Sequence, residues 1–166
     1  MSLSFKAVTL EDIPALQSLA WPIFTQSFAE ILSPTQNEYM LNWMYGKDTL
    51  ESELKRGCNY YFALCDGTLV GYSCIENIDK QNGIFKLHKI YLDHAYHGKG
   101  IGKSQLMEME KRATEQGGQK IILNVNRSNH AVGFYKKQGW EIIDSVDNHI
   151  GNGFYMNDYV MQKALS

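Results

Sequence analysis

The spacing of apolar and polar positions divides the chain into strand-like and helix-like segments. Short apolar or alternating runs predict strands at 5–8, 60–65, 69–76, 83–92, 120–125, 141–146 and 155–163. Apolar residues that recur three and four positions apart predict helices at 36–45, 49–55, 100–116 and 131–138. A first, longer helix begins near Asp12 and is expected to end at Ser33-Pro34.

Local signals add detail to this pattern. Asp66-Gly67 lies between two predicted strands and is typical of a tight hairpin turn. Pro22 stands inside the first predicted helix, where it should kink or split the helix because proline lacks the N–H that the helix needs. In the helix at 100–116, four apolar side chains are expected to face the core: Leu106, Met107, Met109 and Ala113.

Length and composition limit the class of protein. A chain of 166 residues suits a single domain, here taken as 1–166, with 44% hydrophobic and 20% charged residues. The net charge of −2 argues against a nucleic-acid partner. No apolar run is long enough to span a membrane, and no signal peptide is visible at the N-terminus, so we expect a cytoplasmic protein. The three cysteines lack metal-ligand spacing, so we expect reduced thiols and no metal. The sequence is also compatible with a homodimer.

The chemistry centres on a glycine-rich loop between a predicted strand and a predicted helix. The loop consists of His97, Gly98, Lys99, Gly100, Ile101, Gly102 and Lys103. A glycine turn that opens a helix binds anions, because free backbone N–H groups and the helix dipole converge there. A P-loop would need glycine at His97, and a dinucleotide fingerprint starting at Gly98 would need glycine at Lys103. Both nucleotide motifs therefore fit poorly.

Two blocks of sequence resemble the GNAT acetyltransferases. That family's acyl-CoA loop reads Gln/Arg-x-x-Gly-x-Gly/Ala after a strand of the type Leu-x-x-Ile-Tyr-Val. The chain matches it at Leu87, Ile90, Tyr91, Leu92, Gly100 and Gly102, with His97 in place of Gln/Arg. A later family block, Asn-x-x-Ala-x-x-Phe-Tyr-x-x-x-Gly-Phe, resembles the stretch from Asn129 to Trp140, where Asn129 lies one position nearer to the alanine than in the family and Trp140 replaces Phe. The resemblance implies a mixed α/β fold: a mostly antiparallel sheet with splayed central strands, flanked by helices.

The same resemblance implies acetyl-CoA as cosubstrate and a set of residues that bind it. The main chain of the strand would pair with the pantetheine arm and supply an oxyanion donor, and the loop would hold the pyrophosphate. The implied cosubstrate-binding residues are Ile90, Tyr91, Leu92, His97, Gly98, Lys99, Gly100, Ile101, Gly102, Lys103, Asn129 and Tyr135.

Transfer of an acetyl group to an amine also needs an acid and a base. Tyr135 matches the family's general acid, which would protonate the leaving thiolate; otherwise it is a buried aromatic residue. His88 stands where family members often place a basic carboxylate, and it can accept a proton at neutral pH. Alternatively it fills a partly polar strand face. Glu76, at the end of the preceding strand, is a second candidate for the base.

The acceptor is expected to be a small-molecule amine. The stretch from Ile23 to Phe28, followed by Ser33-Pro34, is similar to bacterial GNAT members that acetylate spermidine and spermine. The expected mechanism is direct attack of a primary amine through a tetrahedral intermediate. Protein amines and amino sugars are rival acceptors, and a non-catalytic acyl-CoA sensor is the rival function. Five aromatic residues could line the acceptor side: Phe24, Phe28, Tyr39, Trp43 and Tyr155.

Overall fold

The computed structural model describes the backbone of residues 1–166 and every side chain except that of Met156. A seven-stranded sheet with the order β1-β2-β3-β4-β5-β7-β6 runs through the molecule. Its strands are β1 (Leu3–Ala7), β2 (Asn59–Cys65), β3 (Thr68–Asp79), β4 (Ile84–Leu92), β5 (Lys120–Asn126), β6 (Glu141–Gly151) and β7 (Phe154–Ala164). Neighbouring strands are antiparallel except β4 and β5, which are parallel.

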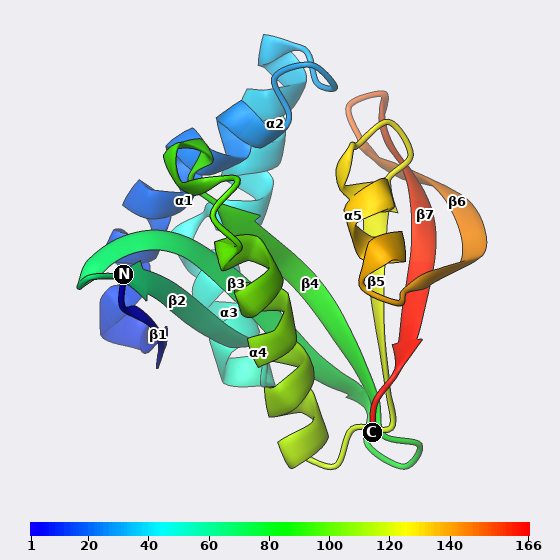
Figure 1. Cartoon of the computed structure of the whole chain (residues 1–166). Coiled ribbons are helices and arrows are strands. Elements are labelled where there is room, and N and C mark those ends of the chain that lie inside the picture. Colours follow the sequence, from blue (N-terminus) through cyan, green and yellow to red (C-terminus); the bar gives the residue numbers. More distant parts are fainter.

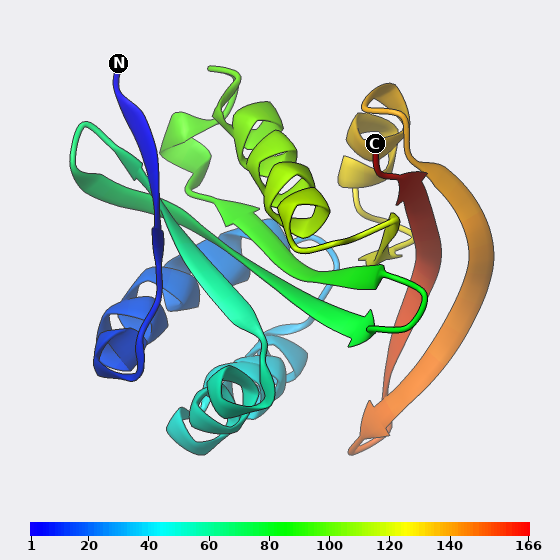
Figure 2. The same ribbon diagram turned by 90° about the horizontal axis from the view of Figure 1, so that it is seen from below.

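Helices cover both faces of this sheet, as the view from below shows (Figure 2). The helices are α1 (Ile13–Ser27), α2 (Pro34–Tyr45), α3 (Lys47–Arg56), α4 (Ile101–Glu115) and α5 (Ala131–Lys137), with 3₁₀ turns at Leu10–Asp12 and His94–Tyr96. Helices α1, α2 and α3 lie on one face, and α4 and α5 lie on the other (Figures 1 and 2). The predicted fold class, a mixed and mostly antiparallel sheet flanked by helices, is confirmed.

Each face has its own buried cluster. On the α1–α3 face, Leu16, Phe24, Leu41 and other apolar side chains pack over Tyr72. On the α4–α5 face, Leu106, Met109 and Ala113 pack over strand residues such as Phe85 and Ile121. No helix in the described part of the chain is both long and apolar enough to cross a membrane.

The first helix differs from the sequence-based expectation in two ways. Of the kink or split expected at Pro22, the split is wrong, because α1 continues from Ile13 to Ser27. The residues around Pro22, including Ile23 and Phe24, are buried in the core, so packing holds the turn that lacks one backbone hydrogen bond. The helix also ends at Ser27 rather than at Ser33-Pro34. The N–H groups of Ile31 and Leu32 instead donate to the carbonyl of Phe28, which forms a turn before α2.

The predicted inward face of α4 is wrong at one position. Leu106, Met109 and Ala113 are buried, but the side chain of Met107 is 56% exposed. The three buried residues are three, four and seven positions apart and share one stripe of the helix, whereas Met107 lies about 100° away from Leu106. The Asp66-Gly67 hairpin is confirmed, with positive φ angles of 51° and 83° that suit a tight turn.

Candidate active site

The central strands β4 and β5 separate after a short paired segment. They pair at only three positions, Ile84 with Lys120, Phe85 with Ile121, and Lys86 with Ile122. Beyond them, β4 continues to Leu92 and β5 to Asn126 without further pairing to each other. We call this region the β4–β5 opening. Its two strand edges carry unpaired main-chain groups, which suit a ligand that pairs like an added strand.

An irregularity in β4 accompanies the separation. Cys74 of β3 pairs with Lys89, but the next residue, Ile75, pairs with Leu87, so His88 is an extra residue in β4. Such a bulge bends a strand and increases its twist. Ile90, Tyr91 and Leu92, the predicted cosubstrate strand, all follow the bulge and lie along the opening.

The glycine loop lies at the far end of β4. Residues 97–100 are exposed, and α4 begins directly after them. Gly98 and Gly100 both have φ of 78°, which an L side chain adopts only at a cost. A Cβ built at Gly98, Gly100 or Gly102 would meet nothing within 4 Å, so the backbone faces open space. Within the described residues, no side chain caps the first turn of α4, so its N–H groups can bind an anion.

His97 has a structural position that the sequence did not indicate. Its Nε2 lies 3.0 Å from the carbonyl oxygen of Leu92, and its ring stacks on that of His94 at 4.5 Å between centroids. Because a carbonyl only accepts, Nε2 carries the proton and donates, and Nδ1 is the ring nitrogen left for another partner. His97 thus ties the loop to the end of β4. Its contact with the cosubstrate stays a prediction.

Tyr135 lies on α5, inside the α4–α5 cluster. Its side chain is buried, and its ring packs against Trp140 at 5.9 Å and Phe134 at 5.5 Å between centroids. Burial raises the pKa of the Tyr135 hydroxyl, so the group keeps its proton at physiological pH. The start of α5 is fixed by Asn129, whose Oδ1 accepts from the N–H of Ala131 at 2.8 Å.

Tyr135 affects the pKa of a neighbouring tyrosine on β4. The pKa of Tyr91 is raised first by burial and then by the neighbouring Tyr135 and Asp158. These three side chains come from β4, α5 and β7, three different elements. On the α1 face, Tyr91 packs against Phe24 and Phe28, each at 6.1 Å between ring centroids.

The two candidate bases lie together. His88 Nε2 is 2.9 Å from Glu76 Oε1. Burial lowers the pKa of His88, and the hydrogen bond with Glu76 opposes this shift. Glu76 is also held by Arg56, whose Nε and Nη2 lie 3.2 Å from the two carboxylate oxygens. Although burial acts against it, the hydrogen bonds from Arg56 and His88 lower the pKa of Glu76, which is therefore an anion.

Cys58 completes a cluster with these two residues. The ligand-type atoms of Cys58, Glu76 and His88 all lie within 4.8 Å of one another, a set that could hold a metal ion. However, Arg56 Nη2 also donates to Cys58 Sγ at 3.1 Å. The guanidinium already balances the charge of the cluster, which favours an ion-pair network. Cys58, Cys65 and Cys74 are free and buried, as the sequence predicts.

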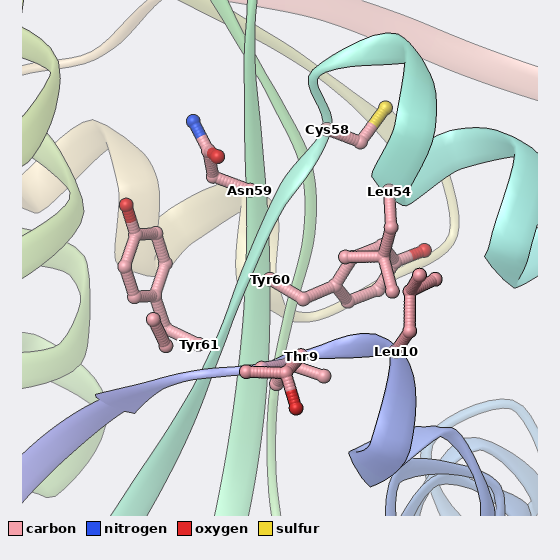
Figure 3. Close-up of a pocket in the computed structure, with 9 residues that line it drawn as sticks. Thr9, Leu10, Leu54, Cys58, Asn59, Tyr60 and Tyr61 are labelled. Atoms are coloured by element: carbon pink, nitrogen blue, oxygen red, sulfur yellow. The ribbon is translucent and has the colours of Figure 1, made fainter.

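Among the described residues, the following two hollows lie beside the sheet, the first of them near the opening. A pocket of about 360 Å³ lies between the α1–α2 turn, the end of β5 and the start of β7. Its lining is Ile31, Leu32, Gln36, Asn126, Arg127, Ser128, Tyr155 and Asn157. A smaller one, of about 240 Å³, lies where β1, α3 and β2 meet (Figure 3). There Tyr60 and Leu54 lie on one side of β2 and Tyr61 on the other (Figure 3).

The aromatic residues expected on the acceptor side have different positions. Tyr155 is 54% exposed and lines the larger pocket. Tyr39 joins α2 to the β6–β7 hairpin, because its hydroxyl donates to the carbonyl of Ile150 at 2.7 Å. Phe24 and Phe28 are core residues, and Trp43 is 50% exposed.

Sequence reasoning missed two buried polar groups beside the opening. Gln105 of α4 donates from Nε2 to the carbonyl oxygens of Tyr72 and Tyr91 and to Ser73 Oγ, each at 3.1 Å, and so joins β3 to β4. Asp158 of β7 is 3% exposed. In the sequence, Asp158 stands inside the predicted strand 155–163, and nothing in that pattern signals that its carboxylate is buried.

Comparisons with known proteins agree with this geometry. A family model described as "Acetyltransferase (GNAT) family" matches residues 13–140. The chain is 29% identical, over 98% of both sequences, to a spermidine N(1)-acetyltransferase of Thermoplasma acidophilum. It is 26% identical to a spermine/spermidine N(1)-acetyltransferase of Bacillus subtilis, over 89% of this chain and 93% of that protein.

Solved structures share the fold along the whole chain. The crystal structure of PaiA N-acetyltransferase from Thermoplasma acidophilum in complex with coenzyme A superposes with a TM-score of 0.83 at 28% identity, over 99% of both chains. A GCN5-related N-acetyltransferase from Rhodopseudomonas palustris superposes with a TM-score of 0.82 at 18% identity, over 99% of this chain and 97% of that one, which shows the fold alone.

Proposed function

We propose that this chain, which belongs to the acetyltransferase (GNAT) family and is an acetyl-CoA-dependent N-acetyltransferase, acetylates a polyamine or another small primary amine. The observation that carries the proposal is the β4–β5 opening, which has the glycine loop at one end and the larger pocket beside the other strand. Two relatives named for spermidine or spermine acetylation support this class of acceptor.

The cosubstrate site consists mainly of backbone. Acetyl-CoA supplies the activated thioester, and the residues along the opening fit its shape and charge. Gly98, Gly100 and Gly102 leave space for a pyrophosphate next to the N–H groups of α4, and Lys99 and Lys103 add positive charge. The free edge of β4 from Ile90 to Leu92 would pair with the pantetheine amides.

Proton transfers in the proposed reaction fall to two side chains, His88 and Tyr135. The amine attacks the thioester carbonyl directly and forms a tetrahedral intermediate. His88 takes the amine proton at Nδ1, because Glu76 holds its Nε2–H. A backbone N–H of β4 stabilises the oxyanion, and Tyr135 gives its proton to the departing thiolate.

Turnover with a panel of amines tests this function. Purified protein with acetyl-CoA is given spermidine, spermine, a lysine-bearing peptide and an aminoglycoside, and the release of free thiol is followed. We expect rapid thiol release with the polyamines and slow release with the peptide. A non-catalytic acyl-CoA sensor would bind acetyl-CoA without releasing thiol for any amine. Faster turnover of the peptide would favour a protein acetyltransferase.

A further inference from the structure

A buried carboxylate without an adequate partner lies beside the opening. Asp158 is 3% exposed, and its Oδ1 has no hydrogen-bond partner among the described residues. A buried charge that lacks a partner costs free energy, so proteins seldom keep one without a use. Ser73 and Lys89, which are also buried, have hydrogen-bond partners, and the Nε2 of buried Gln105 donates to β3 and β4. The Oε1 of Gln105 also has no partner, but it is a neutral amide oxygen, whereas Asp158 carries an ionisable carboxyl group.

Asp158 projects from the acceptor face of the sheet. Its neighbours Tyr159 and Met161 belong to the α4–α5 cluster, and side chains alternate along a strand. Tyr159 points toward α5, so Asp158 points toward the α1–α2 face. In the sheet it pairs with Asn126, the last residue of β5. Asn126 lines the larger pocket.

The surrounding charges do not neutralise Asp158. Burial raises the pKa of its carboxyl, and Asn124, Lys86 and Arg127 oppose this shift without cancelling it. Arg127 is engaged elsewhere, with Asp147 and with the hydroxyl of Ser145. Neither Lys86 nor Arg127 forms a salt bridge with Asp158 in the part of the chain that is described. A cation from outside would therefore gain a strong partner here.

The position relative to the transfer site fits an elongated cation. Asp158 pairs with Asn126, which belongs to the part of β5 that has separated from β4, so the carboxylate lies along the opening and on a different strand from His88. We propose that Asp158 binds an ammonium group of the acceptor, so that the enzyme prefers aliphatic diamines and polyamines to monoamines. This inference rests on the acetyltransferase function proposed above.

A charge-selectivity measurement tests the inference. For the wild type and Asp158→Asn, kcat/KM is measured with 1,3-diaminopropane and with propylamine, which offers the same reacting group without the second charge. The wild type should prefer the diamine. Asp158→Asn should lose about 10–100-fold on the diamine, mainly in KM, and less than about 3-fold on propylamine. Asp144→Asn, at an exposed carboxylate of the neighbouring strand β6, is the matched control and should keep the preference.

The outcomes separate this inference from the proposed function. If the wild type acetylates no amine, the proposed function fails. If the wild type acetylates both amines equally well, or if Asp158→Asn keeps the preference for the diamine, only the role of Asp158 is overturned. An equal loss of kcat on both amines would make Asp158 part of the proton transfer and would also overturn it. The wild-type measurement needs no variant, so equal turnover of the two amines overturns the inference even if Asp158→Asn does not fold.

Discussion

The two sides of the β4–β5 opening present different chemical groups, backbone N–H groups on one side and side chains on the other. On the α4 side, the loop 97–100 and the first turn of α4 present backbone N–H groups, and side chains there are exposed or absent. On the α1–α2 side, the larger pocket is lined by residues of the α1–α2 turn, β5 and β7, and the buried side chain of Asp158 projects from β7. Changes on the first side should therefore affect every acceptor equally, whereas changes on the second should discriminate among acceptors.

The largest effect is expected at Tyr135, where the two sides meet. Tyr135→Phe removes the buried hydroxyl but keeps the ring that packs on Trp140. We expect kcat to fall about 100-fold or more for diamines and monoamines alike, because the leaving thiolate loses its proton donor. The KM for acetyl-CoA should change less than about 3-fold. Steady-state kinetics with both amine types provide the measurement.

Tyr159→Phe is the matched control for this variant, because Tyr159 packs in the same cluster. Its kcat should stay close to that of the wild type. Unchanged kcat in Tyr135→Phe, under conditions where chemistry limits the rate, would remove Tyr135 from the mechanism.

A smaller effect, confined to the cosubstrate, is expected in the loop. Gly100→Ala places a side chain at φ 78°, which costs about 1–2 kcal/mol and disfavours the binding conformation. The KM for acetyl-CoA should rise about 5–30-fold, while the ratio of kcat/KM for diamine and monoamine stays the same. Titration of initial rates with acetyl-CoA checks this.

Gly67→Ala provides a control with the same kind of strain. Gly67 has φ of 83° in the β2–β3 hairpin, and a Cβ there also meets nothing within 4 Å. This variant should lower the melting temperature without changing the KM for acetyl-CoA. If both variants changed that KM equally, the loop would have no specific role.

The smallest expected effect is a shift of pH dependence at the His88–Glu76 pair. As a base, His88 must be neutral, so kcat at saturating amine should fall as the pH drops through its pKa. Burial places that pKa below the usual 6.5, so the fall should occur below pH 6.5. Glu76→Gln removes the carboxylate that favours the protonated ring, and the fall should move to still lower pH.

The pH profile of kcat between 5 and 9 measures this shift, and His88→Ala should abolish the fall. Lys86 and Glu53 also act on the pKa of His88, and Arg56 on that of Glu76, but all three residues are unchanged in these variants. A profile that is the same in the wild type and in His88→Ala would mean that the proton leaves by another route.

The same contrast between the two sides explains what the sequence could reveal. The strand, loop and helix on the α4 side follow one another from residue 85 to 115, so local pattern and motif predict them. The bulge at His88 follows from pairing with β3, which periodicity does not encode. The larger pocket joins Ile31 to Asn157, which lie far apart in the sequence, so no motif spans it.

The errors have a similar origin. Ile31 and Leu32 continue the helical spacing of α1 but belong to a turn, where the same spacing also places apolar side chains against the core. Met107 is apolar and exposed, which composition alone cannot distinguish from a core methionine. Asp158 is polar and buried, the reverse case, and only the packed sheet reveals it.

A crystal structure with a bisubstrate adduct tests the central claim most directly. In the adduct, the sulfur of coenzyme A is joined through an acetyl bridge to one amine of spermidine. The account predicts that the pantetheine runs between β4 and β5, with the pyrophosphate at Gly98–Gly102 and the free ammonium group of the polyamine next to Asp158. A polyamine arm that left on the α5 side, or that lay in the pocket between β1 and α3, would contradict it.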